Sequence, residues 1–282
     1  MPHAVLYSLA RRRVVWWGMN QEEYLAVLHV DALALAAAAR RGLDAPVPSC
    51  PGWYVADLVV HTGAVHRAQA RLVSMRAQQP EGIKREMFAE VPGLLPWFEQ
   101  IMEGTTDLAT IPTGLIRWFE EGAAELERVL READPEEPVW SWSGNNRASH
   151  YLRMMPIETA VHRWDAQLAH DCTQPIDTAL ARDGIDQTFD VMLPARRQWK
   201  EPRIGSGETY HFHRTDGEGE WLLCFDSEDV TVTRQHAKGD VAVRGTASDL
   251  FLFLWGRLPA ERLDVRGDAA LLDRYFELVP PL

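Results

Sequence analysis

The chain has 282 residues, of which 46% are hydrophobic, and its formal net charge at pH 7 is −12. This length exceeds the usual size of a single hydrophobic core, so we expect two domains. The negative charge argues against binding of nucleic acid through its phosphates and against binding to an anionic membrane surface. Chemistry on small molecules and contacts with other proteins remain as functions.

The sequence also predicts a location in the reducing cytoplasm. Its three cysteines, Cys50, Cys172 and Cys224, are widely spaced and leave one over if two are bridged. No stretch reaches the roughly 18 apolar residues that a membrane helix needs. Residues 1–19 are expected to be an N-terminal extension and not a signal peptide, because only a few apolar residues follow their basic cluster.

Residues 20–192 have the pattern of a helical domain. Asn20 to Arg41 begins with a cap residue followed by two acids and ends at Gly42, which predicts a helix. Residues 78–112 contain several prolines and glycines, which predict a long connection with short helical pieces. Further helices are expected within residues 51–75, 113–133, 148–172 and 176–192.

Beyond residue 192 the period changes. Residues 194–208 (PARRQWKEPRIGSGE) are rich in breakers and predict a link. Short alternating or β-branched segments then predict an antiparallel sheet, with one apolar helix at 246–255 and a closing helix at 268–279. Residues 193–282 are therefore expected to form an α+β domain.

Glu158 and His162 are the first candidate metal ligands. They lie four residues apart, which places both side chains on one face of a helix, and Asp165 is next on that face, where it can orient a ligating imidazole. Because the chain has 41 acidic residues and 10 histidines, such pairs also arise by chance, and an ordinary surface pair is the competing interpretation.

His61 is the third candidate ligand. It falls on the inward apolar stripe of the helix predicted within residues 51–75, where a lone histidine is more often a satisfied core residue. With Glu158 and His162 it nevertheless completes a set of two histidines and one glutamate, the set that leaves a fourth position open on a catalytic zinc.

Two weaker features carry competing interpretations. His211 and His213 share one face of a predicted strand, as two metal ligands do, but no third partner lies nearby in the sequence and a solvated strand face is favoured. Cys50 precedes Pro51 at a helix entrance, where a reactive thiol is one interpretation and a buried turn cysteine the favoured one. Motifs of phosphate transfer and serine hydrolysis (GxxxxGK[ST], GxSxG) are absent from the sequence.

Most of the chain, from about residue 20 to 280, resembles the mycothiol-dependent maleylpyruvate isomerase family of actinobacteria. The segments that carry the resemblance are SCPGWYVADLVVHTGAVH, IRWFEEGAAELERVLREADPEEPVWSW, ETAVHRWDAQLA, TDGEGEW, VAVRGTASDLFLFLWGRLP and RGDAALLDRYF. The resemblance implies a two-domain α+β protein, with a DinB-like four-helix bundle at residues 20–192 and a small, sterol-carrier-like α+β domain at residues 193–282.

The resemblance also implies a divalent metal, normally zinc, held by His61, Glu158 and His162. The family's substrate-binding arginine corresponds best to Arg257, although Arg244 and Arg266 lie close in the same module, and a helix-end arginine that contacts carbonyl groups is the competing interpretation. The sequence departs from the family where Ile157 replaces a common histidine. Pro156 can kink the helix before Glu158 or mark a new helix start.

The function implied is a metal-dependent enzyme that activates the thiol of mycothiol for addition to an electrophilic small molecule. An isomerase releases the thiol again after rotation about the former double bond, whereas an S-transferase keeps the adduct. The alternative from another class is a non-catalytic protein that binds a small molecule or a partner on the same scaffold. The sequence predicts no nucleic-acid or membrane partner and leaves the oligomeric state open.

Overall fold

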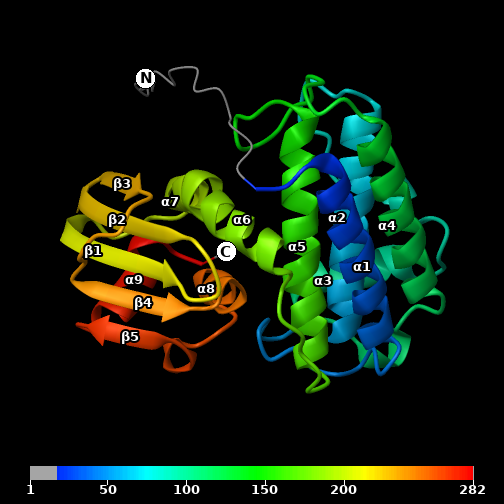
Figure 1. The fold of residues 1–282 in the computed structure, drawn as a ribbon. Helices are drawn as coiled ribbons and strands as arrows, with labels where there is room; N and C mark the ends of the chain where they lie inside the picture. The colour runs from blue at the N-terminus through cyan, green and yellow to red at the C-terminus, as the bar shows by residue number, and fades with distance from the viewer. Residues whose placement is uncertain (1–17, 282) are drawn as a thin grey trace, which may run out of the picture.

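The computed structural model describes residues 18–281, so residues 1–17 of the expected extension lie outside the described residues. A helical bundle and an α+β domain lie side by side, with α6 between them (Figure 1). This arrangement confirms the predicted two-domain α+β class. Within the described residues, no helix combines the length and the apolar character that crossing a membrane requires.

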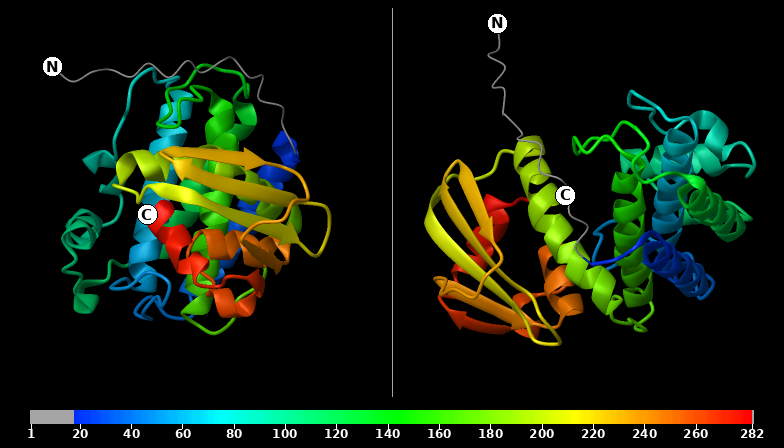
Figure 2. Two further views of the ribbon diagram at one scale, coloured as in Figure 1. Left: turned by 90° about the vertical axis from the view of Figure 1, so that its left-hand side faces the viewer. Right: turned by 45° about the horizontal axis from the view of Figure 1, so that its top comes forward.

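The bundle is built from four long helices that run alongside one another (Figures 1 and 2). Their bounds are α1 Gln21–Ala39, α2 Val55–Ser74, α4 Leu115–Glu132 and α5 Ala148–Leu168. The predicted start of α1 is confirmed by a capping box, in which the Asn20 side chain accepts from the Glu23 backbone and the Glu23 carboxylate accepts from the Asn20 backbone. The long connection contains the predicted short pieces, η1 Arg85–Phe88, α3 Leu94–Glu103 and η2 Leu108–Thr110.

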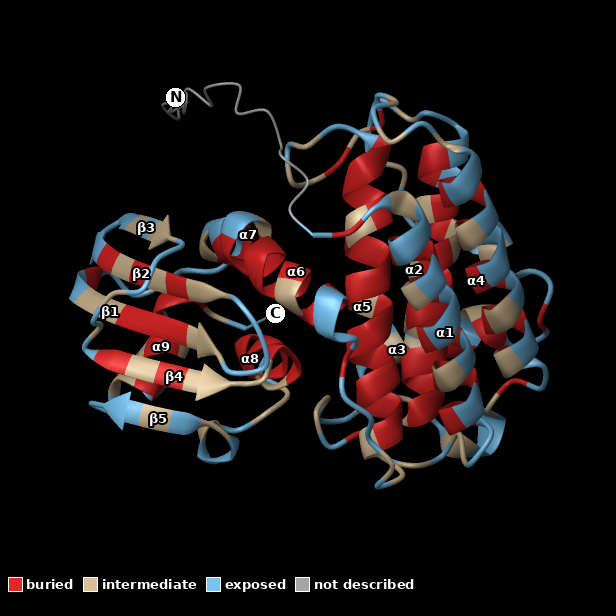
Figure 3. Cartoon of the chain, viewed as in Figure 1, coloured by how far each residue is buried: buried red, intermediate tan, exposed pale blue. Residues whose placement is uncertain are grey.

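Helix α5 is buried on nearly all sides (Figure 3). The other long helices of the bundle lie on one side of α5, and α6 with the C-terminal domain lies on its other side (Figure 1). Pro156 lies inside this helix, which continues through it to Leu168, so the interpretation that a new helix starts at the proline is wrong. Glu158 and His162 therefore belong to one uninterrupted helix.

The C-terminal domain has a five-stranded sheet in the order β3-β2-β1-β4-β5. Its elements are β1 Gly205–Arg214, β2 Glu220–Ser227, β3 Asp229–Thr233, β4 Val241–Gly245, α8 Ala247–Leu254, η4 Ala260–Arg262, β5 Asp264–Gly267 and α9 Leu271–Leu278. The expectation of a purely antiparallel sheet is wrong in one pair, because β1 and β4 are parallel. Residues 234–240 are not a hairpin turn: they cross from the β3 edge to the other side of β1, and such a crossover makes a parallel pair possible.

A continuous helical run joins the bundle to the C-terminal sheet. Helix α6 (Thr178–Gln187) continues through a π-helical turn, η3 (Thr188–Met192), into α7 (Leu193–Trp199). The predicted link is thus helical at its start, and Pro194 lies in the first turn of α7, directly after the π-helical turn.

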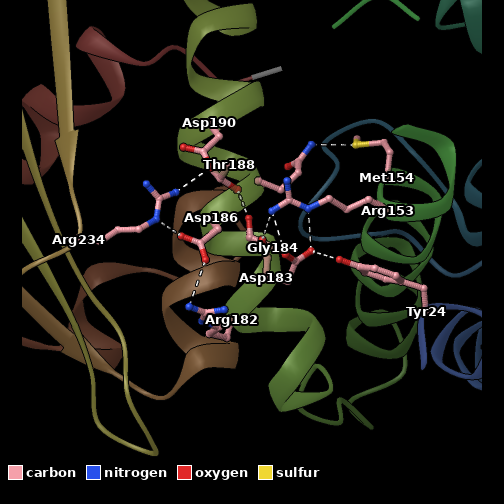
Figure 4. A network of polar contacts seen from close by, with 11 residues as sticks. Tyr24, Arg153, Met154, Arg182, Asp183, Gly184, Asp186, Thr188, Asp190 and Arg234 are labelled. Carbon is pink, nitrogen blue, oxygen red and sulfur yellow. Dashed lines mark hydrogen bonds and ion pairs between the residues drawn. The ribbon is translucent and has the colours of Figure 1, made fainter. Parts of the chain in front are cut away.

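Helix α6 contacts both parts of the molecule through two aspartates (Figure 4). Asp183 accepts hydrogen bonds from Tyr24 of α1 and from Arg153 of α5. Asp186 accepts one from Arg234, which follows β3. Helix α6 thus accepts hydrogen bonds from the bundle and from the C-terminal domain, and these bonds assign it to neither part. The domain boundary expected after residue 192 therefore remains a prediction.

Candidate metal centre

Helices α2 and α5 bring the three predicted ligands together. His61 Nε2 lies 3.5 Å from Glu158 Oε1, and the centroids of the His61 and His162 rings are 5.1 Å apart. One ligand atom from each of the three residues lies within 4.8 Å of the others. The face shared by Glu158 and His162 and the inward position of His61 are as predicted, while their role as ligands remains a prediction.

The charge and exposure of the three residues fit a divalent cation. Burial raises the pKa of Glu158, but its hydrogen bond to His61 and the charges of the two histidines outweigh burial and lower it. The glutamate is therefore ionised at neutral pH. The His61 side chain keeps 34% of its exposure and that of His162 keeps 11%, so the group is open on the His61 side. Two imidazoles and a carboxylate with one open side are a donor set that suits zinc.

Asp165 fixes the His162 ring. Its Oδ2 atom lies 3.1 Å from His162 Nδ1, as the three-residue spacing predicted. A proton on Nδ1 of the neutral ring, donated to this carboxylate, leaves Nε2 free as a metal ligand. Burial raises the pKa of Asp165, and the hydrogen bond to His162 and the charge of Arg257 bring it down to about 2.

Arg257 lies beside this aspartate. Its Nε and Nη2 atoms donate to the two Asp165 oxygens at 3.2 and 3.1 Å, and Nη1 donates to the Trp255 carbonyl at 2.9 Å. Arg257 thus contacts a carbonyl group at the end of a helix and also contacts Asp165 beside the candidate ligands. Arg244 and Arg266 pair with Asp264 on the sheet instead.

Two neighbours of Asp165 come from the link before α2. Ser49 donates its hydroxyl to Asp165 Oδ1 at 2.6 Å, and Cys50 Sγ lies 3.7 Å from Oδ2. Burial and the Asp165 charge raise the pKa of the Cys50 thiol to about 11, so the interpretation of Cys50 as an activated thiol is wrong. Ser49 was not predicted, because nothing in a proline-rich link indicates which side chain meets a helix a hundred residues away.

His66 is a further residue that the sequence did not indicate. Its Nε2 atom lies 2.8 Å from Thr159 Oγ1, and the Thr159 hydroxyl donates to the Met155 carbonyl, so the ring donates from Nε2. Its Nδ1 atom is buried without a hydrogen-bond partner, and burial lowers the pKa of the ring to about 4. A spacing of five residues places His66 away from the His61 face of α2, which is why periodicity missed it.

Comparison with known proteins gives the family. The model of the mycothiol maleylpyruvate isomerase N-terminal domain matches residues 25–167, and that of the MDMPI C-terminal domain matches residues 179–274. Two crystal structures of the mycothiol-dependent maleylpyruvate isomerase, one of them a mutant, are each 16% identical, cover 89% of this chain and 95% of theirs, and give a TM-score of 0.61. This likeness shows a shared fold. A comparison with curated proteins gave no match. The chain belongs to the mycothiol maleylpyruvate isomerase family.

Proposed function

We propose that this protein is a metal-dependent isomerase that uses mycothiol as its thiol co-substrate and acts on a small unsaturated acid of the maleylpyruvate type. The observation that carries the proposal is the convergence of His61, Glu158 and His162 between α2 and α5. The substrate and the thiol follow from the names of the family and of the two solved relatives.

His61, Glu158 and His162 would hold the metal, and zinc is the metal that this donor set favours. When bound, such an ion supplies the positive charge that keeps a thiol ionised at neutral pH. Asp165 holds His162 in the ligating tautomer, and Arg257 holds Asp165 in turn. The pKa of Cys50 is raised to about 11 by burial, which is in keeping with a thiol supplied from outside the chain.

The reaction returns the thiol unchanged. The thiolate sulfur forms a bond to one carbon of the conjugated double bond, and the electron pair moves onto the neighbouring carbonyl. Rotation about the new single bond follows, and the same carbon–sulfur bond then breaks to restore the double bond as the other isomer. In an S-transferase the adduct takes up a proton and stays.

Arg257 has two proposed roles that an experiment can separate. Its planar guanidinium suits a substrate carboxylate, and in this structure it grips both oxygens of Asp165. Arg257→Lys keeps the charge but loses this two-point geometry. A raised KM for the acid with unchanged metal affinity would indicate substrate binding, whereas weaker metal binding would indicate positioning of Asp165.

The test compares Glu158→Gln with Glu103→Gln, a control in which an exposed carboxylate on α3 is replaced. Both proteins are purified without chelator, and their metal content and circular dichroism are measured. We expect Glu158→Gln to lose about one equivalent of metal relative to wild type, together with the thiol-dependent activity, while the control keeps both.

Product analysis separates the remaining functions. Isomerisation of maleylpyruvate that requires mycothiol and leaves no adduct in the mass spectrum supports an isomerase, and a persistent adduct supports an S-transferase. Equal rates with glutathione, cysteine or no thiol would contradict a dedicated thiol site. Wild-type protein without metal or turnover would favour the non-catalytic binding protein.

A further inference from the structure

A second group of metal-ligating side chains lies on the C-terminal sheet. Strand β1 alternates, so that Tyr210 and Phe212 point into the core while His211 and His213 lie on the opposite face. Glu220 of β2 is the register partner of His213 and therefore shares that face. The outer face of the sheet turns away from the bundle (Figure 2).

The crossover segment supplies the fourth residue. His236 lies within residues 234–240, which connect β3 to β4, and its ring centroid is 5.3 Å from that of His211. His236 Nδ1 lies 2.6 Å from Glu220 Oε2, the same oxygen that His211 Nε2 approaches at 3.1 Å. The other oxygen, Oε1, lies 2.9 Å from His213 Nδ1.

These contacts aim three imidazole nitrogens at one carboxylate. The ligand atoms of these four residues all lie within 4.8 Å of one another, as do those of His61, Glu158 and His162. A simple ion pair needs one imidazole, whereas here three imidazoles contact the two oxygens of one carboxylate. Three imidazoles and one carboxylate are, however, a complete four-ligand set for a borderline cation such as Zn²⁺, Ni²⁺ or Cu²⁺.

Three of the four residues stand on paired strands, and the fourth, His236, is exposed to solvent. His211, His213 and Glu220 stand on strands that are paired in register with their neighbours. The His236 side chain keeps 80% of its exposure and borders a surface cavity of about 540 Å³. Arg214 and Arg234 also line this cavity, and each pairs with an aspartate, Asp216 and Asp186 respectively, so their charge next to a cation is compensated.

We propose that His211, His213, Glu220 and His236 form a second transition-metal site, separate from the one in the bundle, which fastens residues 234–240 across the outer face of the sheet. All four ligand positions come from this chain, so the site is structural in type. Metal bound there orders the crossover that makes the β1–β4 pair parallel.

The test uses full-length protein without a histidine tag, stripped of metal by chelator and then titrated with Zn²⁺. The background variant His162→Ala removes a ligand of the bundle site, so that the remaining binding reports on the sheet. In this background we expect one remaining site, and we expect His236→Ala to weaken it by at least roughly tenfold. His236 is exposed, so its substitution leaves the packing of the sheet intact.

The matched control is His29→Ala in the same background, because His29 also lies 2.9 Å from a glutamate, Glu127, but the other partner of that glutamate is Arg131, and within residues 18–281 no third metal-ligating side chain joins them. We expect this control to keep the remaining site. Hydrogen exchange of residues 234–240 gives a second readout and should slow on addition of Zn²⁺ unless His236 is replaced. Zn²⁺ binding in the His162→Ala background that is absent, or equal with and without His236, would overturn the proposal. Because Glu158→Gln reports on the bundle alone, failure of one site is distinguishable from failure of the other.

Discussion

The bundle triad and the sheet cluster contain similar side chains but are held by different means. His61 and Glu158 are nearly a hundred residues apart, and the tertiary contact between α2 and α5 brings them together. The sheet cluster spans residues 211–236, and strand register places three of its four members. A helical site therefore depends on packing, whereas a strand site depends on pairing.

The two groups also differ in what supports them. In the bundle, Asp165 is fully buried, and its oxygens contact His162, Arg257 and Ser49. On the sheet, the neighbour of His213 across the β1–β4 pair is Arg244, which pairs with Asp264 at the surface. Because Asp165 is buried, its removal should cost much of the free energy of unfolding. The Arg244–Asp264 pair is exposed to solvent, so its removal should cost little.

The largest expected effect comes from the buried support. Asp165→Ala leaves Arg257 and the His162 N–H without their acceptor, so we expect a loss of about 3–5 kcal/mol in the free energy of unfolding. Metal affinity should fall about 10–100-fold, because a ligating histidine loses its orienting carboxylate. Chemical denaturation and Zn²⁺ titration measure the two effects, and a fully stable variant with unchanged affinity would show that the support is dispensable.

Packing around the helices gives the next effect. A Cβ atom added at Gly63, two residues after His61, would clash with the Trp118 ring of α4, and one added at Gly184 of α6 would lie 2.6 Å from Phe251 Cε2. We expect each Gly→Ala variant to lose about 1–3 kcal/mol, although alanine at an open helical site stabilises by up to about 1 kcal/mol. Only Gly63→Ala should also weaken metal binding in the bundle; an equal loss in Gly184→Ala would break the distinction between the two regions.

A pH effect of similar size is expected from His150 in the first turn of α5. Burial lowers the pKa of this ring to about 4, with a smaller contribution from the Arg153 charge. The unfolded chain takes up the proton at about pH 6.5 and the folded chain only near 4, so stability falls as the pH drops through this window, by at most about 1.4 kcal/mol per pH unit.

Denaturation curves at pH 7, 6 and 5 measure this slope. We expect it to be flatter in His150→Gln than in wild type. The same slope in both proteins would assign the pH dependence to other groups.

The smallest effect is expected at the surface pair beside the sheet cluster. Asp264→Asn removes the partner of Arg244, and because both side chains are more than 40% exposed, we expect a change of about 0–1 kcal/mol. Zn²⁺ binding in the His162→Ala background should not change. A loss comparable to that of Asp165→Ala would show that the two supports do not differ as burial predicts.

Local signals in the sequence were sufficient for most elements and for part of the site. Asn20 and Glu23 marked the start of α1, alternation marked β1, and the four-residue spacing placed Glu158 and His162 on one face. Such signals are properties of neighbouring residues, so they survive without knowledge of the fold. The same reasoning stopped at His211 and His213, since the partners that complete their group come from another strand and from a crossover.

What the sequence by itself determined about this protein is the helix and strand pattern, the two-domain class and the family. Only the tertiary structure decided which side chains meet: that Arg257 grips Asp165, that Ser49 and Cys50 join them, and that His236 reaches Glu220. The physical reason is that spacing along a chain sets the direction of a side chain on its own element, whereas the packing of whole elements sets what lies opposite to it.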